Sequence, residues 1–122
     1  MNFQLLNKKN FVDFGCAGVI GNYHPFGCGS APSDETRIRV FCPEGCKRTI
    51  WGSGWYTDDS SVCTAAIHEG ILPRDQSGWV EIINDHRCDH FLGATKNGVT
   101  TKYYDRWPRS FSFTGYAKLG GN

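Results

Sequence analysis

The segment that decides the fold begins with Cys42-Pro-Glu-Gly-Cys46 and continues to Tyr56-Thr-Asp-Asp-Ser-Ser-Val-Cys63-Thr-Ala-Ala-Ile-His-Glu-Gly70. Its second part predicts an α-helix over residues 58–70, because polar residues can cap the first turn and Gly70 lies where a C-terminal cap belongs. A helix of this length is marginally stable by itself. We therefore expect its stability to come from the surrounding elements and from a bridge made by Cys63.

The predicted helix is apolar over most of its circumference. Asp59 or Ser60 is the expected N-cap. Only Ser61, Thr64 and His68 form a polar stripe, at spacings of three and four residues. So narrow a stripe is typical of a buried helix, and we expect His68 to hydrogen-bond into the surrounding wall.

Short segments of alternating apolar and polar residues flank the helix and predict β-strands. In one of them, Ile38, Val40 and Cys42 share a face. Lys96-Asn97-Gly98 predicts a tight turn. With one helix available, the expected fold class is α+β: a single central α-helix wrapped by short antiparallel β-strands and stapled by disulfides. The expected strands are residues 11–16, 37–42, 78–84, 99–104 and 110–114.

Length and composition predict one folded domain. The chain has 122 residues, of which 39% are hydrophobic and 14% aromatic, which is enough for a core. No internal repeat or linker is present. We expect an N-terminal extension at residues 1–10, a domain at residues 11–115 and a C-terminal tail at residues 116–122.

The charges exclude two classes of partner. The 13 basic and 12 acidic residues give a net charge of +1 and are scattered along the chain. This pattern gives no electrostatic footprint for nucleic acid and no polybasic membrane patch. No apolar run approaches the roughly 20 residues that span a bilayer. We expect neither a cofactor nor a membrane-spanning segment.

The six cysteines indicate a disulfide framework formed in an oxidising compartment. Six cysteines allow about 15 pairings, so the residues alone do not fix the connectivity. Reduced thiols and a zinc site are the alternatives, although no Cys-x-x-Cys pair is present. The cysteines are Cys16, Cys28, Cys42, Cys46, Cys63 and Cys88.

The N-terminus argues in the other direction. Residues 1–10 are polar, include Lys8 and Lys9, and lack the apolar stretch and cleavage site of a signal peptide. Either Met1 is an internal or engineered start of a secreted chain, or the protein is intracellular. We expect an extracellular or secretory location, with an intracellular assembly as the alternative.

An ordered series of motifs resembles the LCCL domain family. The resemblance covers residues 11–115 and is most specific between Cys42 and Gly70. The motifs are Cys42-Pro-Glu-Gly-Cys46, Ile50-Trp51-Gly52, Tyr56-Thr-Asp-Asp-Ser-Ser-Val-Cys63, Ala65-Ala-Ile-His68-x-Gly70, Asn97-Gly98-Val99 and Trp107…Ser110-Phe-Ser-Phe113.

The resemblance implies a central helix between β-sheets and two disulfides. One disulfide would join Cys63 to Cys46, and the other would join Cys42 to a cysteine on the first strand. Two upstream cysteines and an additional Cys88 depart from that pattern. We expect Cys16–Cys42 with Cys28–Cys88, and the swapped pairing Cys28–Cys42 with Cys16–Cys88 is the alternative.

The resemblance also implies a function. The family is found as an extracellular module with proposed roles in adhesion and in recognition of lipopolysaccharide or other carbohydrate, and no catalytic residues carry over. We expect a non-catalytic recognition module whose partners are proteins, surface glycans or lipids. The alternative is a structural subunit of an extracellular filament or of a ciliary or cytoskeletal lattice.

Two groups of residues suggest chemistry of other kinds. His86, Cys88 and His90 have the residue types of zinc ligands but lack the fourth ligand of a structural site. Cys63 or Cys46 with His68 has the residue types of a nucleophile and its base. We interpret the first group as a surface turn and the cysteines of the second as bridged, and expect no metal and no catalysis.

Aromatic residues supply the candidate binding site, since exposed aromatic rings commonly contact sugars and proteins. We expect Trp51 and Trp107 to belong to the core, and Trp55 and Tyr104 to be exposed. The predicted ligand-binding residues are Trp55, Tyr56 and Tyr104.

Overall fold

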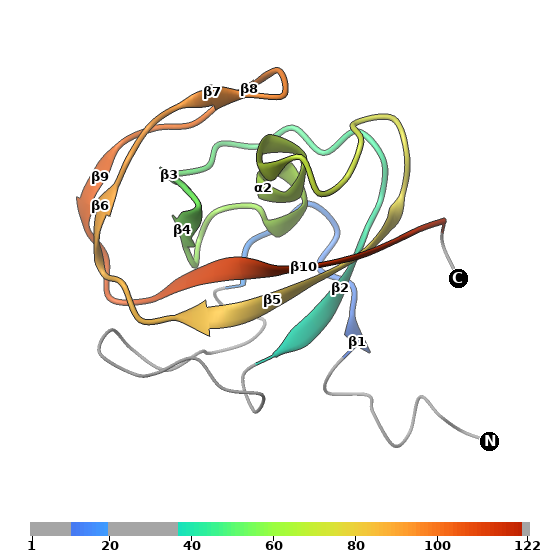
Figure 1. The fold of residues 1–122 in the computed structure, drawn as a ribbon, viewed down its shortest axis with the longest axis horizontal. Coiled ribbons are helices and arrows are strands. Elements are labelled where there is room, and N and C mark those ends of the chain that lie inside the picture. The colour runs from blue at the N-terminus through green and yellow to red at the C-terminus, as the bar shows by residue number, and fades with distance from the viewer. Residues whose placement is uncertain (1–10, 20–36, 121–122) are drawn as a thin grey trace.

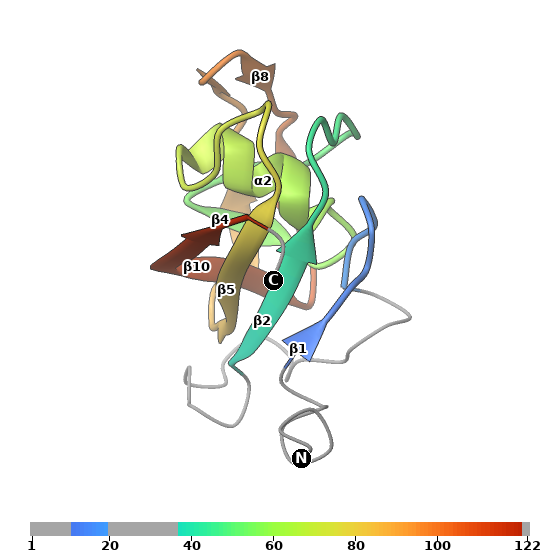
Figure 2. The ribbon, with the colours of Figure 1, turned by 90° about the vertical axis from the view of Figure 1, so that its right-hand side faces the viewer.

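The computed structural model describes residues 11–19 and 37–120 and contains a six-stranded sheet with α2 on one side of it (Figure 1). Figure 2 shows β10, β5, β2 and β1 lying side by side beneath the helix. The strands, in their order across the sheet, are β1 (Phe11–Val12), β2 (Ile38–Cys42), β5 (Gly78–Asp85), β10 (Ser110–Leu119), β4 (Trp55–Thr57) and β3 (Gly52–Ser53).

The strand pairing corrects the expectation of a purely antiparallel fold. Strand β1 pairs with β2 in parallel, whereas the other neighbours in the sheet are antiparallel. A parallel pair needs a long connection, and the chain between Val12 and Ile38 is long enough to provide one.

Two small ladders extend from the sheet. The first pairs β6 (Asp89–Phe91) with β9 (Tyr104–Arg106), and the second pairs β7 (Thr95–Lys96) with β8 (Val99–Thr100). In Figure 1 these orange ribbons curve from the sheet towards the far side of α2. Asn97 and Gly98 form the predicted tight turn, with φ of 53° and 78°. The single predicted strand over 99–104 is wrong, because β8 and β9 belong to different ladders.

Helix α2 (Val62–Glu69) is shorter than predicted. Ser61 is the N-cap, rather than Asp59 or Ser60, and its side chain accepts a hydrogen bond from the Thr64 N–H. Gly70 is the C-cap with φ of 81°, a left-handed conformation that glycine adopts without steric cost. The start was misplaced because several consecutive residues are good caps and only the backbone geometry selects one.

The helix is buried on all sides. Seven of its eight residues are buried, including the polar Thr64 and His68. It contacts β2 of the sheet on one side and β7 and β8 on the other. The burial prediction is therefore confirmed, and the α+β class with disulfides holds for the part of the chain that the structure describes.

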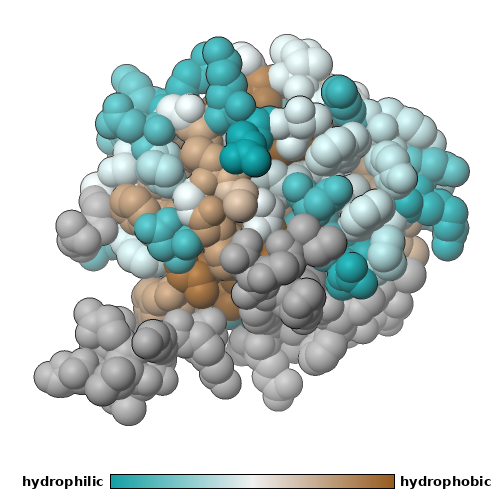
Figure 3. All heavy atoms as spheres, turned by 180° about the vertical axis from the view of Figure 1, so that it is seen from behind, coloured by the Kyte–Doolittle hydropathy of each residue, from teal (hydrophilic) through white to brown (hydrophobic). Residues whose placement is uncertain are grey.

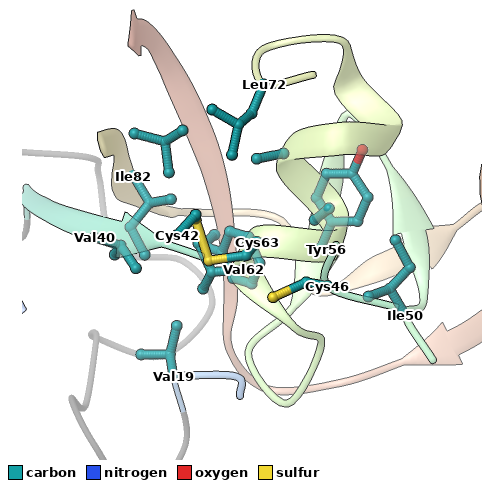
Figure 4. Packing of buried hydrophobic residues seen from close by; sticks show 14 of the residues in the cluster. Val19, Val40, Cys42, Cys46, Ile50, Tyr56, Val62, Cys63, Leu72 and Ile82 are labelled. Atoms are coloured by element: carbon teal, nitrogen blue, oxygen red, sulfur yellow. A yellow bond between two sulfur atoms is a disulfide. The ribbon is translucent and has the colours of Figure 1, made fainter. Parts of the chain in front are cut away.

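The disulfides differ from the expected pairs. Cys42 is bonded to Cys63, and Cys16 is bonded to Cys46. Cys42 ends β2 on its buried face and lies against the first turn of α2 (Figure 4). Cys42, and not Cys46, is therefore the partner of Cys63. The expected pairs Cys46–Cys63 and Cys16–Cys42 are wrong, and so are both alternative partners of Cys42 and Cys16.

The third expected pair involves Cys28, which lies outside the described residues. Cys28–Cys88 therefore stays a prediction.

The core is formed by the buried face of the sheet and by α2. Ile38, Val40 and Cys42 are buried as the alternation in β2 predicted, and Val80 and Ile82 of β5 lie opposite them. The rear surface carries a band of hydrophobic residues between hydrophilic ones (Figure 3). No helix within residues 11–19 and 37–120 is long and apolar enough to cross a membrane.

Strand β10 runs to Leu119, which pairs with Gly78 of β5. The sheet therefore continues past residue 115, where we expected the domain to end.

Candidate binding surface

Three aromatic side chains from two parts of the chain line a small cavity. Trp51, Tyr104 and Trp107 surround a volume of about 120 Å³, together with Thr57 and Asp59. Trp51 and Asp59 come from the segments on either side of β4, whereas Tyr104 and Trp107 come from β9 and the turn after it. The cavity thus combines aromatic faces with one carboxylate.

Trp107 is hydrogen-bonded to the buried carboxylate of an ion pair. Its indole Nε1–H donates to Asp58 Oδ1 at 2.6 Å, and the Arg109 Nε–H donates to Asp58 Oδ2 at 2.9 Å. The Asp58 side chain is fully buried. Tyr104 packs edge-on against Trp107 with ring centroids 5.7 Å apart. Trp107 is therefore held by its indole N–H, and Tyr104 packs against it.

Trp51 is fixed through its backbone. Its N–H donates to Ser60 Oγ at 2.9 Å, and its carbonyl accepts from the Thr57 N–H at 3.2 Å. Trp51 also forms an isolated parallel bridge with Lys102, which precedes β9. These bonds tie the two sides of the cavity together.

Asp59 offers a hydrogen-bond acceptor at the cavity. Thr57 Oγ1 donates to Asp59 Oδ1, and no hydrogen bond to Asp59 Oδ2 is formed by the described residues. A carboxylate oxygen accepts hydrogen bonds from hydroxyl groups, and such charge-assisted bonds are stronger than neutral ones. The cavity can therefore hold an apolar ring face and a hydroxyl at once.

A second hollow adjoins the first through Trp107. It has a volume of about 210 Å³ and is lined by Cys88, Arg106, Trp107 and Pro108. Arg106 is exposed, and no salt bridge pairs it within the described residues. The exposed strand β9 contributes Tyr104 to the first hollow and Arg106 to the second.

The predicted ligand residues lie in three different environments. Tyr104 is 41% exposed and lines the cavity, whereas Tyr56 has no exposed surface and belongs to the core. Trp55 is half-buried: its Nε1–H donates to the Asp89 carbonyl at 3.1 Å and Arg87 stacks on its ring. The structure does not bring these three together, and Tyr56 is not accessible to a ligand.

The expectation that Trp51 and Trp107 belong to the core is wrong. Both are half-buried, and their rings line the cavity. The cavity forms where segments that are distant in the sequence meet. A local sequence pattern therefore could not predict that these two rings line it.

Comparison with known proteins now identifies the family. The family model described as the LCCL domain matches residues 24–111. The chain belongs to the LCCL domain family.

Several relatives share the LCCL domain region. The chain is 40% identical to Clotting factor C of Tachypleus tridentatus over 79 residues, which are 62% of this chain and 8% of that protein. It is 42% identical to human Cysteine-rich secretory protein LCCL domain-containing 1 over 66 residues, or 52% of this chain and 13% of that protein. It is 30% identical to human Cochlin over 83 residues, or 66% of this chain and 15% of that protein. The chain therefore spans only a small part of these relatives.

This LCCL domain also contains a hydrogen-bond network around the buried Tyr56. The Tyr56 hydroxyl lies 2.8 Å from His68 Nδ1 and 2.5 Å from Glu69 Oε1. His68 Nε2 lies 3.1 Å from the Ala94 carbonyl, which can only accept, and Lys96 Nζ pairs with Glu69 at 3.3 Å. The prediction that His68 bonds into the wall around the helix is confirmed.

The network shifts three pKa values. Burial lowers the pKa of His68, because desolvation disfavours the imidazolium. Burial alone would raise the pKa of Glu69, but bonds from Tyr56 and Lys96 outweigh it and lower the pKa. Burial and the neighbouring Glu69 carboxylate raise the pKa of Tyr56. His68 and Tyr56 are thus neutral and Glu69 is charged at neutral pH.

Cys63 and Cys46 are both bridged, so neither provides a thiolate for His68. His86 and His90 are exposed, and no cluster of three metal-ligating side chains occurs within the described ranges.

Proposed function

We propose that this LCCL domain is an extracellular, non-catalytic recognition module that binds a carbohydrate-containing ligand at the cavity of Trp51, Tyr104 and Trp107. The observation that carries the proposal is the combination of three aromatic side chains with the Asp59 carboxylate around a cavity of about 120 Å³. Recognition sites are typically concave, mainly apolar, and supplied with a few polar groups that fix orientation.

The chemistry favours a sugar. The ring faces of pyranoses carry C–H groups that pack on aromatic rings, while their hydroxyls need acceptors such as Asp59 Oδ2. The cavity is smaller than the roughly 300–1,000 Å³ of sites for drug-sized ligands. It therefore receives a single ring, and the remainder of a glycan or lipopolysaccharide-like ligand would lie over β9 and the hollow beside Arg106.

The disulfides support an extracellular setting. Such bonds persist in oxidising compartments and are rare in cytosolic proteins. One relative is named a cysteine-rich secretory protein. We further propose that the module is a helix held between strands on several sides and that it extends to the end of β10, so that the C-terminal tail begins after Leu119.

A structural subunit of a larger assembly is the second candidate. Leu119 is 49% exposed at the edge of β10, where a neighbouring protein could pack. The two candidates differ in their main partner, which is a glycan for the first and a protein for the second.

A glycan array that includes lipopolysaccharides and glycosaminoglycans tests the proposal. We expect the native domain to be retained by a restricted set of glycans and Tyr104→Ala to weaken retention by about tenfold, equivalent to roughly 1.4 kcal/mol. Asp59→Asn is expected to weaken it as well, since the carboxylate charge is lost.

Tyr103→Ala is the matched control, because Tyr103 is a neighbouring tyrosine that is 56% exposed and does not line the cavity. It should leave retention unchanged. Absence of any retained glycan, or equal losses from the Tyr103 and Tyr104 variants, would contradict the proposal.

A further inference from the structure

A groove larger than either of these hollows lies on a different part of the molecule. It has a volume of about 570 Å³ and opens between the end of α2 and the end of β10. Ile67, Ile71 and Leu72 line it from the helix and the following loop, and Ala117 and Leu119 line it from the sheet. Leu119 is 49% exposed. The groove is mainly apolar and shares no residue with the aromatic cavity.

Strand β10 has an open backbone edge beside this groove. Its partner on that side, β4, pairs only with Ser110 and Phe111. Towards the end of β10, no described residue forms backbone hydrogen bonds with that side of the strand. In Figure 2 the arrow of β10 lies on the outer side of β5.

The register shows which backbone groups are open. Leu119 pairs with Gly78 of β5, and the next N–H, that of Gly120, donates to the Ser77 carbonyl at 2.9 Å. Hydrogen-bonded and non-hydrogen-bonded pairs alternate along an antiparallel ladder. The N–H and C=O groups of Ala117 and Leu119 therefore point away from β5, towards the open edge. The same two residues line the apolar groove.

The charge beside the groove is positive. Arg74 lines it, and its Nη2 donates to the Gly98 carbonyl at 3.0 Å, but it makes no salt bridge with a carboxylate within the described residues. Among the described residues that line the groove, none is acidic. Strand β10 itself contains Lys118 and no acidic residue.

We propose that this groove is a docking site for an extended peptide segment of a partner protein that carries apolar side chains and a carboxylate. The segment adds a strand to the open edge of β10, a recognition mode in which main-chain bonds give affinity and side-chain pockets give specificity. Alternate apolar side chains enter the groove, because strand side chains point to opposite faces in turn. The carboxylate pairs with Arg74.

A second copy of this chain fits the groove less well. Two β10 edges paired about a twofold axis would bring Lys118 and Arg74 of both copies to one interface without an acidic side chain from either β10. Like charges placed across a strand pair are destabilising. The charges therefore favour a partner with a carboxylate.

A phage-displayed library of random decapeptides, selected on the native chain, tests the proposal. We expect enriched peptides to show apolar residues at alternate positions and an Asp or Glu. Leu119→Glu and Arg74→Glu should each weaken binding of a synthetic enriched peptide by at least about tenfold. Ala117→Pro should do the same by removing an N–H that β5 does not use.

Leu92→Glu is the matched control, since Leu92 is 52% exposed at the end of β6 and lies outside the groove. It should bind the peptide as the native chain does. Thermal unfolding of each variant separates loss of binding from loss of fold, and N-methylation of alternate peptide nitrogens should abolish binding through the backbone edge.

Each of the following outcomes would overturn the proposal. One is an absence of enriched peptides. Another is enrichment without alternation or a carboxylate, or binding that N-methylation does not affect. The third is a concentration-dependent dimer in sedimentation experiments that Leu119→Glu dissociates, which would assign the groove to a second copy.

Discussion

The hydroxyl of Tyr56 has one proton and lies between two hydrogen-bond acceptors. The Ala94 carbonyl requires a proton on His68 Nε2, so neutral His68 has an accepting Nδ1, and Glu69 Oε1 is an acceptor as well. The hydroxyl donates its proton to Glu69, because the lowered pKa of that carboxyl keeps it charged and a charged acceptor forms the stronger bond. The Tyr56 side chain therefore connects β4 to His68 and Glu69 of α2.

Tyr56→Phe removes that connection: Glu69 Oε1 keeps its bonds from the Lys96 Nζ and the Gly54 N–H but loses the bond from the Tyr56 hydroxyl. We expect the free energy of unfolding to fall by about 1.5–3 kcal/mol, the usual net contribution of a hydrogen bond to a charged group. Urea denaturation measures it. The control, Tyr103→Phe, removes an exposed hydroxyl bonded to Asp105 and should change stability by less than about 0.5 kcal/mol. Equal effects from the two variants would contradict this account of the network.

Residue environments were predictable only where a local pattern decides them. The burial of Ile38, Val40 and Cys42 follows from their alternation, and that of His68 from the narrow polar stripe of its helix. Adjacent Trp55 and Tyr56 could not be separated, because which of two neighbouring aromatic residues faces inward depends on the register of β4 with β10.

At the scale of elements, the turn after β2 determines the disulfide pairing. Cys42 faces the core and bonds Cys63 of α2, whereas Cys46, after the Pro-Glu-Gly turn, meets Cys16 from the segment that follows β1. One disulfide therefore links β2 to α2, and the other links the turn after β2 to the N-terminal segment.

Replacing both Cys42 and Cys63 by serine should lower the free energy of unfolding by about 2–4 kcal/mol, because a bridge restricts the unfolded chain. Thermal unfolding checks the loss. Digestion with trypsin and a glutamate-specific protease under non-reducing conditions checks the pairing, since cleavage at Glu44 separates Cys42 from Cys46. A fragment that links Cys46 to Cys63 would contradict the structure.

Element ends were predicted where one residue type is required. Gly70 and the Asn97-Gly98 turn adopt positive φ as expected. The parallel pairing of β1 and the connectivity of the cysteines were not predictable, because both depend on contacts between segments about 20 to 30 residues apart, such as Cys16 and Cys46 with a separation of 30.

For the whole molecule, the buried titratable groups set how stability depends on pH. His68 has a lowered pKa, so between its folded and unfolded values the unfolded chain binds more protons. Glu69 and Asp85 also have lowered pKa values; for both, burial opposes the shift, and for Asp85 the bonds from Arg87 outweigh it. All three groups therefore contribute stability that is lost as the pH falls.

We expect the urea midpoint to fall as the pH decreases from 7 through the ordinary histidine pKa of 6.5, and to fall further below the ordinary carboxyl pKa values near 4. His68→Gln should remove the first stage, whereas His86→Gln, at an exposed position, should retain it. A midpoint that rises between pH 7 and pH 5.5 would contradict the assigned protonation states.

The central claim is that this LCCL domain recognises a glycan at the cavity of Trp51, Tyr104 and Trp107. Its most direct test is a nitrogen–proton correlation spectrum of the four tryptophan indoles during titration with a glycan retained on the array. The account predicts shifts of the Trp51 and Trp107 signals, with those of Trp55 and Trp79 unchanged. Shifts confined to Trp55 or Trp79, or no shift at saturation, would contradict it.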